Sequence, residues 1–293
     1  MSAISFPEPA TAAEVGEHAQ PRPRRWYRQP ALASGAIVLA IIVAAAVAAP
    51  LLTRYNPIKQ NLNASLLGPS AQHLLGTDQL GRDTFTRLLY GLRTDLRIAF
   101  IAVCAPFCIG TILGSIAGYF GGWVDSLLMR LVDIVVAFPF YVLIIALVFV
   151  LGPGQRSIYI AITLVGWVSY ARIIRGEILV AKRQEYVLAA RSAGLSAVRI
   201  MARHLLPNVI TQAIIYAMSD IVQDILAIVT LGYFGLGVPP PTPDIGSMIN
   251  DGQNFLTTHW QLTTFPGLAV VVVGLSLSLI GDGLADIIRP GQS

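Results

Sequence analysis

The sequence predicts an all-α polytopic membrane protein with about six transmembrane helices, and three observations lead to this fold class. Only 12% of the 293 residues are charged and 55% are hydrophobic, whereas a soluble domain usually carries about 25% charged residues. The mean hydropathy is +0.66, so a water-soluble fold would have to bury more apolar surface than its interior can hold. Several apolar runs also approach the roughly 20 residues that a spanning helix needs. Inside lipid each such run must be helical, because its backbone finds no hydrogen-bond partner outside itself.

The chain begins with a polar segment, residues 1–30, which has no periodicity and is predicted to be a disordered cytoplasmic tail with a basic end. Within it, residues 22–28 bring four arginines and two aromatic residues up to the first apolar run, as is typical of a membrane anchor. Residues 31–53 are predicted to be the first transmembrane helix. A signal peptide is disfavoured, because this run is longer than the about 7–15 apolar residues of such a peptide.

Residues 98–288 are predicted to form a core of five further transmembrane helices, followed by a short cytoplasmic tail at residues 289–293. The apolar runs of this core cover residues 98–119, 127–151, 158–181, 209–231 and 265–280. With six spans, both termini lie on the same side of the membrane. Thirteen Lys and Arg residues fall on that side and seven on the other, so the positive-inside rule places both termini in the cytoplasm.

Two long loops, residues 54–97 and 233–264, are predicted on the outer side of the membrane. The end of the first loop is amphipathic. Its apolar side chains recur at helical spacing, at Phe85, Leu88, Leu89 and Leu92. We expect a separate helix there that lies on the outer membrane surface, either as a docking or gating element or as scaffolding.

Catalytic, nucleotide-binding and metal-binding patterns are not found in the sequence. No stretch fits GxxxxGK[ST], HExxH or GxSxG, and the four histidines are scattered along the chain. Cys104 and Cys108 lie one helical turn apart in a run without another metal-ligating residue, so they are interpreted as small buried hydrophobic residues. The 20 basic residues do not form one stripe, which argues against a nucleic-acid partner. We therefore predict a non-enzymatic chain that itself binds no cofactor or metal.

The inner loop, residues 182–208, is predicted to be a helix, a glycine turn and a second helix. Residues 185–192 have strong helix propensity, and Gly194 can adopt the left-handed conformation that ends a helix. Ser196 is a suitable N-cap for a second helix that Pro207 would end. Small residues and arginines on this helix pair suit the approach of another protein, although a solvated helix pair at the membrane surface would show the same pattern.

This inner loop resembles the EAA signature of binding-protein-dependent ABC importers, which reads Glu-Ala-Ala, three residues, Gly, nine residues, Ile-x-Leu-Pro. The signature is matched at Ala189, Ala190, Gly194, Leu206 and Pro207. Leu188 and His204 stand where the signature has Glu and Ile. Both departures resemble the peptide and nickel branch of the family, which has EYVxAA, as at Glu185 and Tyr186, and ends in HxLPN, as at Asn208.

Two further segments resemble the same branch. Residues 73–91 are similar to its HxLGTDxxGRDxxxRLLYG stretch, and residues 234–284 are similar to its glycine- and proline-rich C-terminal third. The resemblance runs from about residue 30 to residue 291. The chain is thus identified as similar to the C-type permease subunits of dipeptide, oligopeptide and nickel importers.

The resemblance implies a type I ABC importer permease fold in the bacterial inner membrane, together with a set of partners. A second, homologous permease would complete a heterodimer, and an extracytoplasmic binding protein would deliver the substrate. One or two separate ATPase subunits would bind ATP and Mg. The joint with the ATPase would consist of Glu185, Tyr186, Ala189, Ala190, Arg191, Gly194, His204, Leu206 and Pro207.

Ionisable residues inside a span are costly and often functional, which makes Asp220 and Asp224 candidates for the substrate pathway. The resemblance adds Ile228, which stands where related permeases tend to have a Glu. We predict that Asp224 faces the pathway and meets a peptide amino terminus; the alternative is that it pairs with a neighbouring helix. The resemblance favours di- and oligopeptides and leaves nickel chelates, glutathione and other small solutes open. A secondary transporter is the main alternative class, but it would leave the inner loop unexplained.

Overall fold

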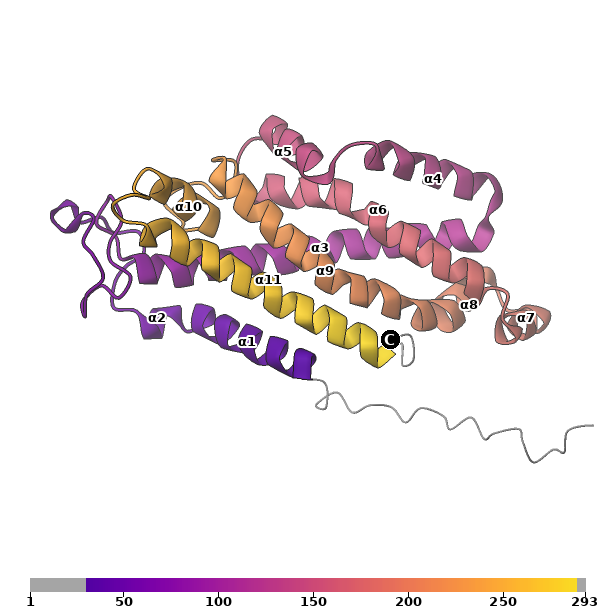
Figure 1. Ribbon diagram of the computed structural model, residues 1–293. Coiled ribbons are helices and arrows are strands. Elements are labelled where there is room, and N and C mark those ends of the chain that lie inside the picture. The colour runs from indigo at the N-terminus through magenta and orange to yellow at the C-terminus, as the bar shows by residue number, and fades with distance from the viewer. Residues whose placement is uncertain (1–29, 289–293) are drawn as a thin grey trace, which may run out of the picture.

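The computed structural model describes residues 30–288, which form a helical bundle without β-strands (Figure 1). The predicted tails, residues 1–29 and 289–293, lie outside the described residues. The helices are α1 (Pro30–Val47), α2 (Ala49–Leu52), η2 (Leu62–Ala64), α3 (Thr84–Phe120), α4 (Gly122–Val136), α5 (Phe140–Leu151), α6 (Gln155–Ala181), α7 (Glu185–Ser192), α8 (Ala197–Ile200), the π-helical turn η3 (Met201–Leu205), α9 (Leu206–Tyr233), α10 (Ile245–Gln253) and α11 (Gln261–Ile288).

Five helical segments are long and apolar enough to cross a membrane: α1, α3, α6, the run from α8 to α9, and α11. Together, α4 and α5 make a sixth candidate, so the prediction of an all-α membrane protein with about six spans is confirmed. The predicted span at residues 127–151 is not one straight helix, because α4 and α5 are bent by 85°. The cause is Pro139, which lacks an amide proton and disfavours a helical conformation in the residue before it.

The predicted separate helix around residues 85–92 is instead the first part of α3, which runs unbroken for 37 residues. Asp83 caps this helix by accepting a hydrogen bond from the Thr86 amide at 2.8 Å. Helix α3 then continues into the core, where one carboxylate oxygen of Asp95 accepts a hydrogen bond from the Ile245 amide at 3.0 Å, at the start of α10. This tertiary contact gives a partner to one of the two oxygens of Asp95, the acidic residue between the amphipathic and the apolar parts of the helix.

Helices α3 and α6 pack at close range through a stripe of glycines on α3, at Gly110, Gly114 and Gly118. A Cβ atom on Gly114 would lie 2.5 Å from the Ala171 carbonyl oxygen, and one on Gly118 would lie 2.8 Å from the Ile178 Cβ. Small residues four apart let helix backbones approach closely in membranes, where lipid provides no hydrophobic drive for association. This GxxxGxxxG spacing is visible in the sequence and predicts the contact, but our sequence analysis did not use it.

Replacing Gly114 with alanine is expected to destabilise the bundle by about 1–3 kcal/mol, because the new methyl group must push α6 away from α3. The matched control is Gly267→Ala in α11, where no atom lies within 4 Å of the added Cβ. There the substitution is expected to be neutral or stabilising by up to about 1 kcal/mol, because alanine favours a helix over glycine. Thermal unfolding of the detergent-solubilised protein measures both effects. An equal change in the two variants would contradict the packing argument.

The two ends of the bundle differ in their connecting segments (Figure 1). One end carries α10 and residues 53–83, and the opposite end carries α7 and α8. The start of α1 and the end of α11 both point toward the α7 end. This arrangement agrees with the predicted placement of both termini on the side of the inner loop, and the assignment of that side to the cytoplasm stays a prediction.

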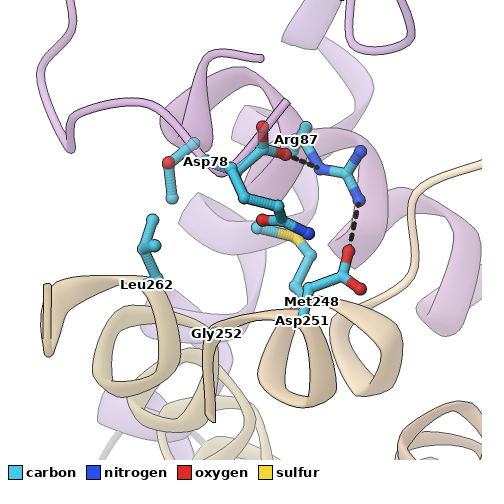
Figure 2. A pocket seen from close by; sticks show the side chains of 8 residues that line it. Asp78, Arg87, Met248, Asp251, Gly252 and Leu262 are labelled. Atoms are coloured by element: carbon cyan, nitrogen blue, oxygen red, sulfur yellow. Dashed lines mark ion pairs between the residues drawn. The ribbon is translucent and has the colours of Figure 1, made fainter. Parts of the chain in front are cut away.

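A network of ion pairs fastens the loop before α3 to α10 at the end opposite α7 (Figure 2). Asp78 accepts from Arg82 Nε at 2.7 Å and lies 3.5 Å from Arg87 Nε. Both arginines also reach Asp251 of α10, at 3.5 and 3.9 Å. The two arginine side chains are only 7% and 4% exposed, so the carboxylates are needed to compensate their buried positive charges. Burial also raises the pKa of Asp244, the N-cap of α10.

Candidate functional site

The inner loop forms the predicted helix and glycine turn. Helix α7 ends in a turn in which the Leu195 amide donates to the Ala190 carbonyl at 3.2 Å and the Gly194 amide donates to the Arg191 carbonyl at 3.0 Å. These two bonds define a Schellman motif. Gly194 has φ of 75°, and no atom lies within 4 Å of a Cβ built on it. The predicted left-handed cap is confirmed, and its glycine is required by backbone conformation rather than by crowding.

The second part of the loop differs from the prediction at its end. Ser196 caps α8 by accepting the Arg199 amide at 3.4 Å, as expected. Pro207 lies in the first turn of α9, but it does not end the preceding helix, because the chain is helical from Ala197 to Tyr233. A π-helical turn, η3, lies before the proline. Its hydrogen bonds join residues five apart instead of four, and the chain stays helical past Pro207, which has no amide proton to donate.

The inner loop has a buried side and an exposed side. Val187 and Ile200 are completely buried against the bundle. Ala190 is also turned inward, at 8% exposure, whereas Leu188 is 49% exposed. Among the predicted joint residues, the exposed ones are Glu185, Tyr186, Ala189, Arg191, Gly194 and Pro207, and the half-buried ones are His204 and Leu206. This surface mixes exposed apolar, small and charged side chains, as protein interfaces do.

Several contacts connect the inner loop to the rest of the bundle. The Arg191 guanidinium lies 5.4 Å from the centre of the Tyr119 ring at the end of α3. Lys182 donates to the Gly118 carbonyl at 2.7 Å. About two turns before Lys182, in α6, Arg175 donates to Asp125 of α4 at 2.6 Å. The inner loop therefore contacts α3 directly, and α6, which leads into the loop, contacts α4. Sequence reasoning missed these contacts because their partners are 50 or more residues apart.

A cavity of about 270 Å³ lies where α4 and α5 meet, against the middle of α6 and α9. Its walls are formed by Val135, Val136, Phe138, Phe140, Val165, Gly166, Val168, Ser169, Arg172, Tyr216, Asp220 and Gln223. A second, more open depression of about 480 Å³ shares Arg172 and Tyr216 and adds Glu177 and Gln212. Because these residues lie nearer to the α7 end of α6 and α9, the two hollows form one track along the bundle.

The three predicted pathway residues have different surroundings. Asp220 lines the larger cavity and accepts a hydrogen bond from the buried Tyr170 hydroxyl at 2.7 Å. Asp224, one turn further along α9, is 1% exposed, and neither carboxylate oxygen has a hydrogen-bond partner among the described residues. Ile228 is buried in the apolar core and is not brought to the cavity. Arg172 was not among the predicted pathway residues, although an arginine inside an apolar run is a signal for such a role.

Two family models match the sequence, one near its beginning and one over its last 184 residues. Residues 110–293 match the family described as binding-protein-dependent transport system inner membrane component. Residues 24–69 match the N-terminal transmembrane domain of oligopeptide transport permease C. The resemblance inferred from the motifs is therefore confirmed.

Individual proteins with similar sequences or structures agree with this family. Dipeptide transport system permease protein DppC of Alkalihalophilus pseudofirmus is 39% identical over 256 residues, which cover 87% of this chain and 84% of that protein. Glutathione transport system permease protein GsiD of Pectobacterium atrosepticum is 35% identical over 271 residues, which cover 91% and 89%. A chain of the inward-facing methionine ABC transporter MetNI superposes with a TM-score of 0.54 on 69% of this chain and 97% of that chain.

At 17% identity, the likeness to the MetNI chain shows the fold alone. That fold is the one expected from the inner-loop motif, an ABC importer permease. The family match covers residues 110–293, more than half of the 293 residues. The relatives align along most of their own length as well as along most of this chain. The chain therefore belongs to the family of binding-protein-dependent transport system inner membrane components.

Proposed function

We propose that this permease subunit imports di- or oligopeptides across the bacterial inner membrane and is driven by a separate ATPase. The observation that carries the proposal is the helix, glycine turn and helix at residues 182–208, exposed at one end of the bundle in a chain that belongs to this importer family. A relative named for dipeptide transport supports peptides as the substrate class. The relative named for glutathione transport supports glutathione, itself a small peptide, as the alternative.

The inner loop is proposed to dock on the ATPase and to face the cytoplasm. Its exposed face would enter a cleft of the ATPase, with Glu185, Tyr186, Ala189, Arg191 and Gly194 in contact. Ala190, His204, Leu206 and Pro207 would hold this face in position, since the first three are at least partly buried and Pro207 lies at the junction with α9. Closure of the ATPase would then move α3 and α4 through the contacts of Tyr119 and Asp125.

The remaining partners follow from the same proposal. A second, homologous permease would complete the translocation pathway as a heterodimer. An external binding protein would deliver the peptide at the end that carries α10, where the buried ion pairs of Arg82 and Arg87 hold α10 against the start of α3. ATP and Mg would be bound by one or two ATPase subunits and not by this chain. Asp220, which lines the cavity, would contribute negative charge to the pathway, and the buried Asp224 would add charge from one helical turn behind it. The buried Ile228 would pack behind both residues.

Mass identification of the proteins that co-purify with the tagged permease in mild detergent tests this assignment. The expected result is a second permease and one or two ATPase chains. Reconstitution of that complex with its binding protein should then give ATP-dependent uptake of labelled dipeptides, with competition by glutathione deciding between the two substrates. A homo-oligomer that transports without an ATPase would overturn the proposal in favour of a secondary transporter.

A further inference from the structure

We propose that the cavity between the α4–α5 bend, α6 and α9 binds a zwitterionic ligand, with Asp220 facing its ammonium group and Arg172 facing its carboxylate. The inference rests on the proposed peptide import and names what the membrane domain recognises, namely the two charged ends of a short peptide. It makes Arg172 a substrate-binding residue, a role that the inner-loop motif and the family match do not give it.

The cavity has the properties of a ligand site rather than of a packing defect. Its volume of about 270 Å³ far exceeds the about 30 Å³ that one water occupies in the liquid. It exists because α4 and α5 are bent by 85°, so no straight helix fills the space beside α6. Broken helices that border a cavity near the middle of the bilayer are typical of substrate sites in transporters. The Tyr216 side chain, paired with Ser169 and Gln223, gives this wall a polar surface.

The negative wall of the cavity lacks a cation. The Asp220 carboxylate has one hydrogen bond, from the Tyr170 hydroxyl, and no ion pair among residues 30–288. Behind it, both oxygens of Asp224 are buried without any partner. Two ionised carboxylates one helical turn apart, with no basic partner within the described part of the chain, are unfavourable in a membrane, and a cation beside them lowers that cost. An ammonium group that enters beside Asp220 would supply that charge.

The positive wall lacks an anion. Arg172 lines the same cavity, is exposed, and has no ion pair or hydrogen bond within the described residues. Arg175, one turn further along α6, shows the contrast, because Asp125 holds it at 2.6 Å. An unpaired guanidinium inside a span can hold a carboxylate with two parallel hydrogen bonds. Both signs of charge therefore line one cavity, and no ion pair joins Arg172 to Asp220.

This pattern selects the chemical class of the ligand. A simple anion would be repelled by Asp220, and a simple cation would be repelled by Arg172. No group of three metal-ligating side chains occurs in the described residues, so a chelated metal finds no protein ligand set there. The second depression continues the track with Glu177, so charge alternates from Asp220 to Arg172 to Glu177 toward the α7 end. A zwitterion can move along such a track while one of its ends stays paired.

The direct test measures ligand binding to the complete complex of permeases and ATPase in lipid nanodiscs, without the binding protein. The three probes are alanyl-alanine, its N-acetyl derivative and its C-terminal amide. The affinity of the complex for each probe is measured by saturation-transfer NMR, which detects weak binding. Loss of a hydrogen-bonded charge is expected to weaken binding about 10- to 100-fold. The wild-type complex should therefore bind either blocked peptide that much more weakly than alanyl-alanine.

Two variants assign the two ends of the peptide. Arg172→Gln should bind alanyl-alanine and its amide equally, while it still discriminates against the N-acetyl peptide. Asp220→Asn should show the reverse. Arg156→Gln, at the start of α6 and outside the cavity, is the matched control and should retain both discriminations. The readout is a change in preference between ligands, so a general loss of folding cannot imitate it.

The inference is overturned if the wild-type complex binds the three ligands equally or binds none of them. It is also overturned if both variants keep the wild-type preferences. These outcomes are separate from the failure of the proposed function, which is read from ATP-dependent uptake with the binding protein present. Peptide uptake by a complex that binds blocked and free peptides equally would contradict only the cavity assignment. Preferential binding of the free peptide without uptake of any peptide would contradict only the proposed peptide import.

Discussion

Replacement of Gly194 by aspartate is expected to reduce ATP-dependent uptake by about 100-fold or more while the permease still inserts and folds. The turn leaves room for a side chain, and aspartate tolerates positive φ better than most residues, so the bundle itself loses little. The new carboxylate would project from the face that we propose to dock in the ATPase cleft. A misplaced charge in a docked interface costs several kcal/mol, and about 2.8 kcal/mol corresponds to 100-fold.

Two controls separate docking from backbone strain. Gly194→Asn keeps the tolerance for positive φ without the charge, and it should retain most of the uptake. Gly235→Asp places the same carboxylate on another open glycine with φ of 75°, in the same kind of turn after α9 at the opposite end of the bundle, and should leave the amount of co-purified ATPase unchanged. The measurements are uptake into proteoliposomes and the amount of ATPase that co-purifies. Normal ATP-dependent uptake in Gly194→Asp would show that the turn is not part of the transmission joint.

Replacement of Asp224 is expected to move stability and uptake in opposite directions. The carboxylate is 1% exposed and its oxygens have no partner, so Asp224→Leu should remove a buried polar cost and stabilise the fold by about 1–3 kcal/mol. If the charge serves the peptide amino terminus, uptake should fall about tenfold or more in both Asp224→Leu and Asp224→Asn. Thermal unfolding and uptake at saturating binding protein are the two measurements.

The opposite pattern would support the alternative role of Asp224. A carboxylate that holds a neighbouring helix in place would give a less stable Asp224→Leu variant, with uptake reduced only in proportion to the folded protein. Ser276→Ala in α11 serves as a comparison, because it removes a buried hydroxyl that is satisfied by the Val272 carbonyl at 2.7 Å. That variant should lose a little stability and no uptake. Unchanged peptide uptake in Asp224→Asn would remove the pathway role.

The local features of the inner loop were predictable because they depend on neighbours in the sequence. A left-handed cap at Gly194 and an N-cap at Ser196 each involve hydrogen bonds over five residues or fewer. The bend at Pro139 is equally local, yet the sequence analysis treated the run around it as one span. The interpretation there followed the apolar composition of the run, although the proline indicated a break in the helix.

By itself, the sequence determined the membrane class, the number of apolar runs and the inner-loop motif, because each of these follows from composition or short-range spacing. Only the tertiary structure decided that α3 continues past Asp95, since the amide that donates to this carboxylate comes from Ile245. It also placed Asp220 and Arg172 on one cavity and left Ile228 in the core. The physical reason is that burial and charge pairing depend on which helices meet, and residues of helices that meet here are as far apart in sequence as Leu32 of α1 and Gly283 of α11.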